Sequence, residues 1–149
     1  KLNEVVRKVI VYFFIVSILF ILGCGIANIS MVEAPILTVE VLRQETEWTP
    51  SKIEMMIRFI SKEYKFDCNE LIWLAEQESS LYRNKKCGDN GKSCGLYQIK
   101  EITWNEFVQK YKLNYTDRFN PVDQTIATGL ALKDGKQLLW SPYKKLLAH

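Results

Sequence analysis

One carboxylic acid stands at a spacing that favours acid catalysis. Leu71, Leu74 and Ala75 precede Glu78 by seven, four and three residues, so in a helix these side chains share one face. Desolvation on an apolar face raises the pKa of a carboxyl group. A carboxyl that stays protonated can donate its proton to a poor leaving group such as a glycosidic oxygen. A glutamate near a helix end is usually a solvated residue, so this assignment needs further support. Glu76 faces another side, although spacing alone does not exclude it.

Three cysteines lie near this acid in the sequence, one before it and two after it. Cys87 and Cys94 bracket the six-residue, turn-rich stretch GDNGKS, which suits a disulfide in an exported protein. Closing so short a loop stabilises a fold by about 2–3 kcal/mol through restriction of the unfolded chain. Cys68 is then unpaired, unless it takes one of the other two as its partner. Spacings of 19 and 7 residues without a nearby histidine make a zinc site a poor alternative.

Other metal and cofactor sites find no support in the sequence. The single histidine, His149, argues against a histidine-based metal site and against a Ser-His-Asp triad. The GKS at 91–93 lacks the earlier glycine and the preceding strand of a phosphate-binding loop. The stretch 89–93 lacks the alternating oxygen ligands and the distal glutamate of a calcium loop. We therefore expect no metal and no cofactor.

The N-terminal segment has the composition of a membrane-spanning helix. Residues 9–29 are 21 residues without a charge, and at about 1.5 Å per residue they cross a hydrocarbon core of about 30 Å. Basic residues stand at 1, 7 and 8, and Glu33 is the first charge after the segment. The positive-inside tendency then places the N-terminus in the cytoplasm and the chain after Ala34 outside. A buried core helix that is apolar all round would be unusual in so small a protein.

Residues 1–30 are therefore predicted to be a membrane anchor or a signal segment. An apolar run of 21 residues is long for a signal peptide, and no A-x-A cleavage site follows it. ILGC at 21–24 resembles a lipobox with Cys24 as the acceptor, so a lipoprotein is the second interpretation and simple secretion the third. All three export the rest of the chain to the periplasm or the cell surface.

A linker at 31–48 and a compact helical domain at 49–149 are predicted to follow. The linker mixes charges, a proline and β-branched residues, with an extended piece at 36–41. Thr49 and Pro50 suit the start of a helix, and a second helix beginning near Asp67 or Asn69 carries Glu78. Further helices are expected at 100–111 and after Pro121, the latter broken near Asp134 and Gly135. The expected core residues of the 100–111 helix are Ile102, Phe107, Val108 and Tyr111.

Four motifs of this domain, in this order, resemble the transglycosylase SLT domain of the lysozyme-like superfamily. They are Glu78-Ser79 at a helix end, Gly95-Leu96-Tyr97-Gln98-Ile99 after a loop, Thr103-Trp104, and Asn120-Pro121 followed by Gln124. The resemblance extends over residues 53–140, essentially the whole exported domain. Four motifs in the right order are far more specific than any one of them.

The resemblance implies a mainly α-helical, lysozyme-like fold with at most a small hairpin, whose cleft binds peptidoglycan glycan strands. It places Glu78 in the catalytic position. In lytic transglycosylases one glutamate protonates the bond between N-acetylmuramic acid and N-acetylglucosamine. As a base, it then helps the muramyl 6-hydroxyl attack C1, which leaves a 1,6-anhydro end and uses no water.

The same resemblance implies which residues surround the substrate. Gly95, Tyr97 and Gln98 are expected to line the cleft, Ser79 to support the site and Ser93 to orient the substrate. The full expected set of substrate-binding residues is Ser79, Ser93, Gly95, Leu96, Tyr97, Gln98, Ile99 and Trp104. Trp73, Trp104 and Trp140 suit a core better than a sugar platform, although Trp104, beside the motif, fits both roles.

The sequence departs from the family pattern at two points. Tyr97 replaces the usual methionine, as it does in endolysin-like members. The family's tyrosine that bonds the catalytic glutamate has no clear counterpart, because Leu130 and Leu132 stand about where it would fall. The remaining candidates for that tyrosine are Tyr111, Tyr115 and Tyr143.

Two other functions are consistent with these residues. A hydrolytic muramidase needs a second carboxylate about 5–9.5 Å from the acid, and Asp89 is the candidate, although a plain turn role is the simpler interpretation of this residue. A non-catalytic protein could instead bind peptidoglycan and, through its membrane helix, tether a larger envelope-spanning complex. The intact Glu78-Ser79 and Gly95–Ile99 motifs argue against a degenerate, inactive site. The mild net charge of +3 suits a wall polyanion, and we expect no nucleic-acid partner.

Overall fold

A computed structural model of the protein describes residues 37–114 and 117–148. The chain divides into two units, Lys1–Ile36 and Leu37–His149, and the described residues belong to the second. The predicted membrane segment at 9–29, Cys24 and the start of the predicted linker lie outside the described residues. Within the described ranges, no helix is both long and apolar enough to cross a membrane.

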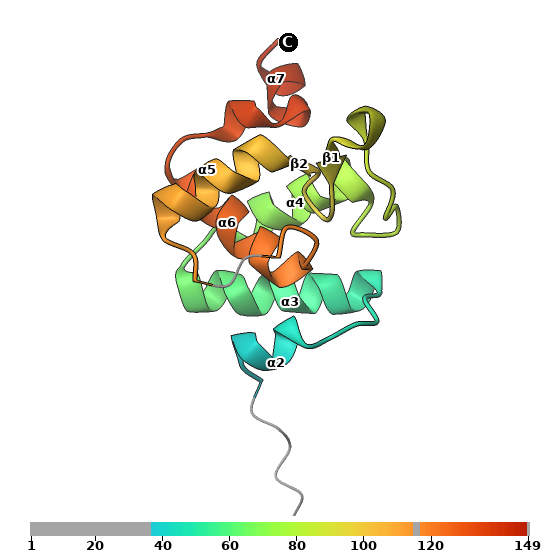
Figure 1. The fold of residues 1–149 in the computed structure, drawn as a ribbon, viewed down its shortest axis with the longest axis vertical. Helices are drawn as coiled ribbons and strands as arrows, with labels where there is room; N and C mark the ends of the chain where they lie inside the picture. The colour runs from blue at the N-terminus through green and yellow to red at the C-terminus, as the bar shows by residue number, and fades with distance from the viewer. Residues whose placement is uncertain (1–36, 115–116, 149) are drawn as a thin grey trace, which may run out of the picture. The chain divides into compact units, whose positions relative to one another are not determined.

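The second unit is mainly helical with one small sheet, as predicted for a lysozyme-like fold (Figure 1). The strands β1 (Ser93–Cys94) and β2 (Ile99–Lys100) pair antiparallel, with Ser93 opposite Lys100 and Cys94 opposite Ile99. The helices, in chain order, are α2 (Val39–Arg43), α3 (Pro50–Tyr64), α4 (Cys68–Ser79), η1 (Asp89–Gly91), α5 (Glu101–Tyr111), α6 (Pro121–Lys133), η2 (Gln137–Leu139) and α7 (Ser141–Leu147).

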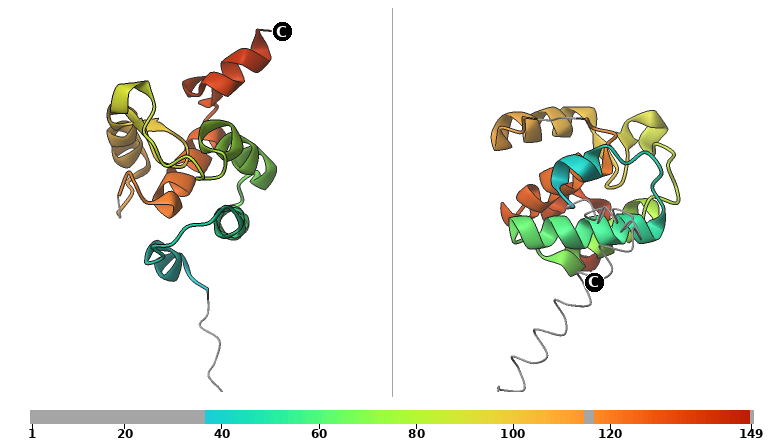
Figure 2. Two further views of the ribbon diagram at one scale, coloured as in Figure 1. Left: turned by 90° about the vertical axis from the view of Figure 1, so that its right-hand side faces the viewer. Right: turned by 90° about the horizontal axis from the view of Figure 1, so that it is seen from below.

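Helix α6 forms the centre of this unit, and four other helices pack around it. Every residue from Pro121 to Gly129 is buried, and α2, α3, α4 and α5 all contact α6. Figure 2 shows α2 and α7 at opposite ends of the unit in its left view. Gly129 allows the Phe66 ring to pack directly against the backbone of α6, because a Cβ at Gly129 would lie 2.3 Å from that ring.

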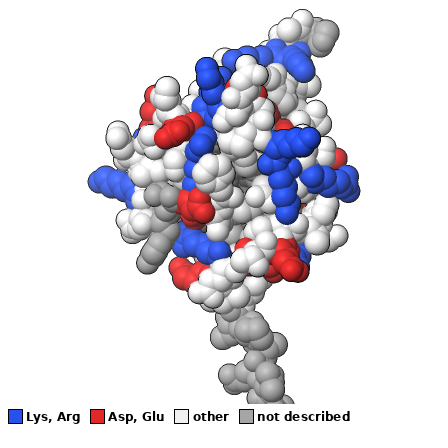
Figure 3. Space-filling model, turned by 45° about the vertical axis from the view of Figure 1, so that its right-hand side comes forward, with Lys and Arg blue, Asp and Glu red and all other residues white. Residues whose placement is uncertain are grey.

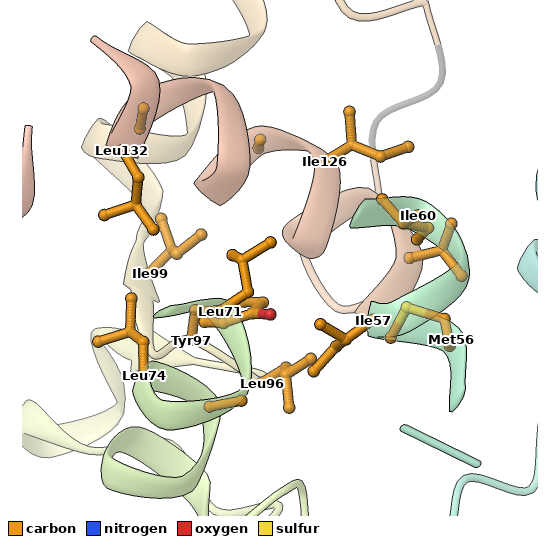
Figure 4. Close-up of a cluster of buried hydrophobic side chains, with 14 of the residues drawn as sticks. Met56, Ile57, Ile60, Leu71, Leu74, Leu96, Tyr97, Ile99, Ile126 and Leu132 are labelled. Atoms are coloured by element: carbon orange, nitrogen blue, oxygen red, sulfur yellow. The ribbon is translucent and has the colours of Figure 1, made fainter. Parts of the chain in front are cut away.

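The core joins apolar side chains from α3, α4, α6 and the hairpin (Figure 4). Helix α3 begins as predicted: the Thr49 hydroxyl accepts a hydrogen bond from the Lys52 amide, and Pro50 occupies the first turn. Burying each of these large side chains contributes on the order of 1.5–3 kcal/mol. The core residues labelled in Figure 4 are Met56, Ile57, Ile60, Leu71, Leu74, Leu96, Tyr97, Ile99, Ile126 and Leu132.

The structure corrects the predicted linker at 31–48. From Leu37 onward these residues belong to the compact unit, and α2 replaces the extended piece expected at 36–41. The Thr38 hydroxyl caps α2 by accepting from the Val41 amide. Arg43 Nε lies 2.7 Å from Asp123 Oδ1 on α6. Capping and packing on α6 therefore outweigh the β-branched composition of this stretch.

The structure also corrects one predicted core position on α5. Ile102 is 76% exposed, whereas Trp104 is 4% exposed and Phe107 is fully buried. Trp104 therefore belongs to the core rather than to a sugar platform. The larger indole and phenyl rings set the rotation of α5 against α6, which leaves Ile102 facing solvent.

Candidate active site

Glu78 lies where α4 leaves the core. The Asp67 side chain caps α4 by accepting from the amides of Asn69 and Glu70. The apolar residues that precede Glu78 on its face are buried, as the spacing predicted, while Glu78 itself is half-buried and lines a cleft of about 570 Å³. Glu76 is exposed and is not part of the cleft lining.

Three stretches of the chain line this cleft. The first is the end of α4 and the loop after it, the second is the hairpin with the start of α5, and the third is the C-terminal stretch. The lining residues are Glu78, Asn84 and 86–89 from the first, Ser93, 98–100 and Thr103 from the second, and 138–141 with Lys144 from the third.

One side of the cleft is a loop that is bonded mainly to itself. The predicted disulfide between Cys87 and Cys94 is present, and Cys68 forms no disulfide within the described ranges. The Gly88 amide donates to Ser93 O at 2.8 Å and to Gln98 Oε1 at 2.9 Å. We call residues 86–100 the loop wall.

Gln124 of α6 supports the loop wall from the core side. Its Oε1 accepts from the Tyr97 amide at 2.9 Å, and its Nε2 donates to Cys94 O at 2.9 Å. Gly95 has a φ of +83°, and a Cβ there would lie 2.1 Å from Gln124 Nε2. A side chain at Gly95 is therefore excluded both by conformation and by space.

The chain leaves α4 through a left-handed turn held by Ser79. Ser80, Leu81 and Tyr82 all have positive φ, at 52°, 52° and 68°. The buried Ser79 hydroxyl donates to Leu96 O at 2.8 Å and accepts from the Tyr82 amide at 3.0 Å. Ser79 thus connects the end of α4, next to Glu78, to the loop wall.

The structure separates the expected substrate-binding residues into two groups. Ser93, Gln98 and Ile99 line the cleft with Glu78 and Asp89. The others are buried and do not line it, which agrees with the supporting role expected of Ser79 and the core role considered for Trp104, but corrects the expected place of Gly95, Leu96 and Tyr97 in the lining. This second group is Ser79, Gly95, Leu96, Tyr97 and Trp104.

The two carboxylates of the cleft have opposite electrostatic environments. Burial and, to a smaller extent, the negative charge of Asp89 together raise the pKa of Glu78 to about 7, against an opposing effect of Lys145. A hydrogen bond from Ser93 and the ammonium of Lys100, whose Nζ lies 3.2 Å from Asp89 Oδ2, lower the pKa of Asp89. Near neutral pH the cleft therefore holds one carboxyl able to donate a proton and one ionised carboxylate.

The opposite side of the cleft was not predicted from the sequence. We call residues 137–144 the helical wall. Trp140 Nε1 donates to Tyr97 O at 3.0 Å, and the Tyr143 hydroxyl donates to Glu70 Oε1 at 2.8 Å. The Tyr143 ring also meets Trp73 edge-on at 4.9 Å. These contacts join residues between 43 and 73 positions apart, so no local spacing signals them.

The tyrosine sought as a partner for Glu78 is not among the described candidates. Tyr111 donates to Asp134 Oδ2 and Tyr143 to Glu70, while Tyr115 lies outside the described residues. Within the described ranges no hydrogen bond reaches the Glu78 carboxylate. In the same ranges no group of three or more His, Cys, Asp or Glu residues could hold a metal ion.

A helical domain whose cleft holds a glutamate with a raised pKa is suited to general acid catalysis. A model of the transglycosylase SLT domain matches residues 55–145, and the chain belongs to this family. It is thereby assigned to enzymes of the lytic transglycosylase type that act on peptidoglycan. Comparisons with curated proteins and with solved structures gave no match.

Proposed function

We propose that the protein cleaves peptidoglycan between N-acetylmuramic acid and N-acetylglucosamine, with Glu78 as acid and then base. The observation that carries the proposal is the half-buried Glu78 in the cleft, with a pKa raised to about 7. The Glu78 proton passes to the glycosidic oxygen as its bond to C1 breaks. The Glu78 carboxylate then takes the proton of the muramyl 6-hydroxyl, whose oxygen bonds C1 and closes the 1,6-anhydro ring.

Digestion of purified peptidoglycan tests this proposal. We expect the full chain, kept in mild detergent, to release fragments with anhydromuramyl ends that mass spectrometry detects. Glu78→Gln should lower the rate by about a thousandfold, the range typical of a lost general acid. Glu76→Gln is the matched control, because Glu76 lies outside the cleft on the same helix. Equal activity of the Glu78→Gln variant and the wild type would contradict the proposal.

A hydrolytic muramidase is the second candidate, because Asp89 lines the same cleft with a lowered pKa. An ionised carboxylate there could hold a water molecule or stabilise an oxocarbenium ion. The product distinguishes the two chemistries: reducing ends that disappear in Asp89→Asn favour hydrolysis. Retained binding without any soluble product would instead favour a wall-binding protein.

We also propose that the domain works outside the cytoplasm, anchored by residues 1–30. The apolar stretch at 9–29 supports the anchor, and the Cys87–Cys94 disulfide supports an oxidising compartment. Separation of cell membranes from soluble fractions, followed by protease treatment of intact spheroplasts, tests both parts. Recovery of the protein in the cytosol would refute the proposal.

A further inference from the structure

Three lysines line the cleft that holds Glu78, and each comes from a different segment. Lys86 belongs to the loop after α4, Lys100 to β2 and Lys144 to α7. Lys100 is paired with Asp89, whereas Lys86 and Lys144 form no ion pair in the part of the chain that the structure describes. Figure 3 shows basic side chains spread over the upper part of one face, with acidic ones between them.

These two lysines have no matching negative charge in the cleft. Its only carboxylates among the described lining residues are Glu78 and Asp89. Asp89 is compensated by Lys100, and the raised pKa of Glu78 leaves that group only partly ionised near neutral pH. An uncompensated pair of cations in a concave site attracts anionic ligands. In stem-bearing peptidoglycan the lactyl carboxyl of N-acetylmuramic acid is tied up in the amide bond to the stem, so the sugars themselves do not supply them.

The helical wall adds an apolar surface beside Lys144. Leu138 is 55% exposed and Leu139 is 48% exposed, and both line the cleft. Exposed leucines next to a free ammonium suit a ligand that alternates small apolar groups with carboxylates. The peptide stem that the lactyl group of N-acetylmuramic acid carries has this chemistry, with methyl side chains and free carboxylates.

Resting on the proposed function, we propose that Lys86, Lys144 and the leucines of the helical wall bind the peptide stem. The substrate is then stem-bearing peptidoglycan rather than bare glycan. Lys86 and Lys144 each pair with a stem carboxylate, while Leu138 and Leu139 contact its methyl groups. Stem recognition would make cleavage precede, rather than follow, any amidase that strips the wall of its peptides.

Binding to two matched ligands tests this inference independently of turnover. The full-length Glu78→Gln variant, in mild detergent, is titrated with soluble, uncross-linked glycan chains that carry stems, and with the same chains after amidase treatment. Amidase treatment leaves a lactyl carboxylate on each muramyl sugar, so the treated chains are also anionic. Tighter binding of the stem-bearing chains would therefore report groups of the stem and not charge on the sugar. Tryptophan fluorescence reports the affinity. We expect the stem-bearing chains to bind about five- to tenfold more tightly, with a preference that weakens as salt is raised.

Variants assign this preference to the two lysines. Lys86→Ala combined with Lys144→Ala should remove it, and arginine at both positions should restore it. Lys62→Ala on α3, exposed and outside the cleft, is the matched control. Equal affinity for the two ligands, binding of neither, or an unchanged preference in the double alanine variant would overturn the inference. Cleavage by the wild type is scored separately, so a stem preference without turnover refutes only the proposed function.

Discussion

The two walls of the cleft are held in place in different ways. The loop wall is closed by a disulfide over seven positions and by hydrogen bonds among its own residues, with Gln124 behind it. The helical wall contains no cysteine, and beyond the local backbone hydrogen bonds of η2 and α7 it depends on Trp140 and Tyr143 reaching distant partners. The loop wall is therefore the more rigid side, and the helical wall the side more easily displaced.

The largest loss of stability is expected from a substitution at Gly95 in the loop wall. Gly95→Ala adds a methyl group that collides with Gln124 and imposes a left-handed conformation on alanine. We expect a loss of about 3 kcal/mol in the free energy of unfolding, measured by urea denaturation. Gly91→Ala is the control in the same wall: its φ is +86°, but nothing lies within 4 Å of the added Cβ. Its cost should be about 1 kcal/mol, and an equal cost at both sites would mean that Gln124 does not support the wall.

The helical wall should show a smaller loss at Trp140. Trp140→Phe keeps an aromatic ring but removes the N–H that donates to Tyr97 O. We expect a loss of about 1–2 kcal/mol in the free energy of unfolding, because a buried carbonyl oxygen loses this donor. The rate of peptidoglycan digestion should fall too, since the wall moves away from Tyr97. Tyr143→Phe, which removes only the hydroxyl bonded to Glu70, should cost less, and a larger cost there would reverse the assignment.

The smallest expected effects are shifts of the pH–rate profile, and their direction should differ between a variant in the loop wall and one next to the helical wall. In the proposed mechanism the reaction requires protonated Glu78, so activity should fall as pH rises through about 7. Asp89, in the loop wall, raises the pKa of Glu78, and Lys145, beyond the helical wall on α7, lowers it. Asp89→Asn should therefore move the alkaline limb of the pH–rate profile to lower pH, and Lys145→Gln should move it to higher pH. Each shift should be less than about one pH unit, and shifts of the same sign would show that Glu78 does not titrate in this limb.

The sequence predicted the loop side of the cleft because its signals are local. Glu78 shares a face with apolar residues within two helical turns, and Cys87 and Cys94 lie seven positions apart. The helical wall gave no comparable signal. Nothing near Trp140 in the chain indicates that its indole meets Tyr97, because that contact depends on how α4, α6 and α7 pack.

Motif resemblance located the right segment but did not show which side chains face the substrate. Leu96 and Tyr97 stand in the same motif as Gln98, yet they point into the core while Gln98 lines the cleft. The orientation follows from the hairpin and from the bonds of Gln124, which a linear pattern does not contain. For the same reason α2 was predicted as linker: its helix depends on packing against α6, about 80 residues away.

The left-handed turn after Glu78 has a consequence for the order in which the protein folds. Three successive non-glycine residues with positive φ are each costly, so an isolated α4 would not hold Ser80, Leu81 and Tyr82 in this geometry. The turn needs the Ser79 hydroxyl, which in turn bonds Leu96 O, 17 positions further along the chain. The end of α4 that carries Glu78 is therefore expected to become ordered only when the loop wall docks, after the body of the helix has formed.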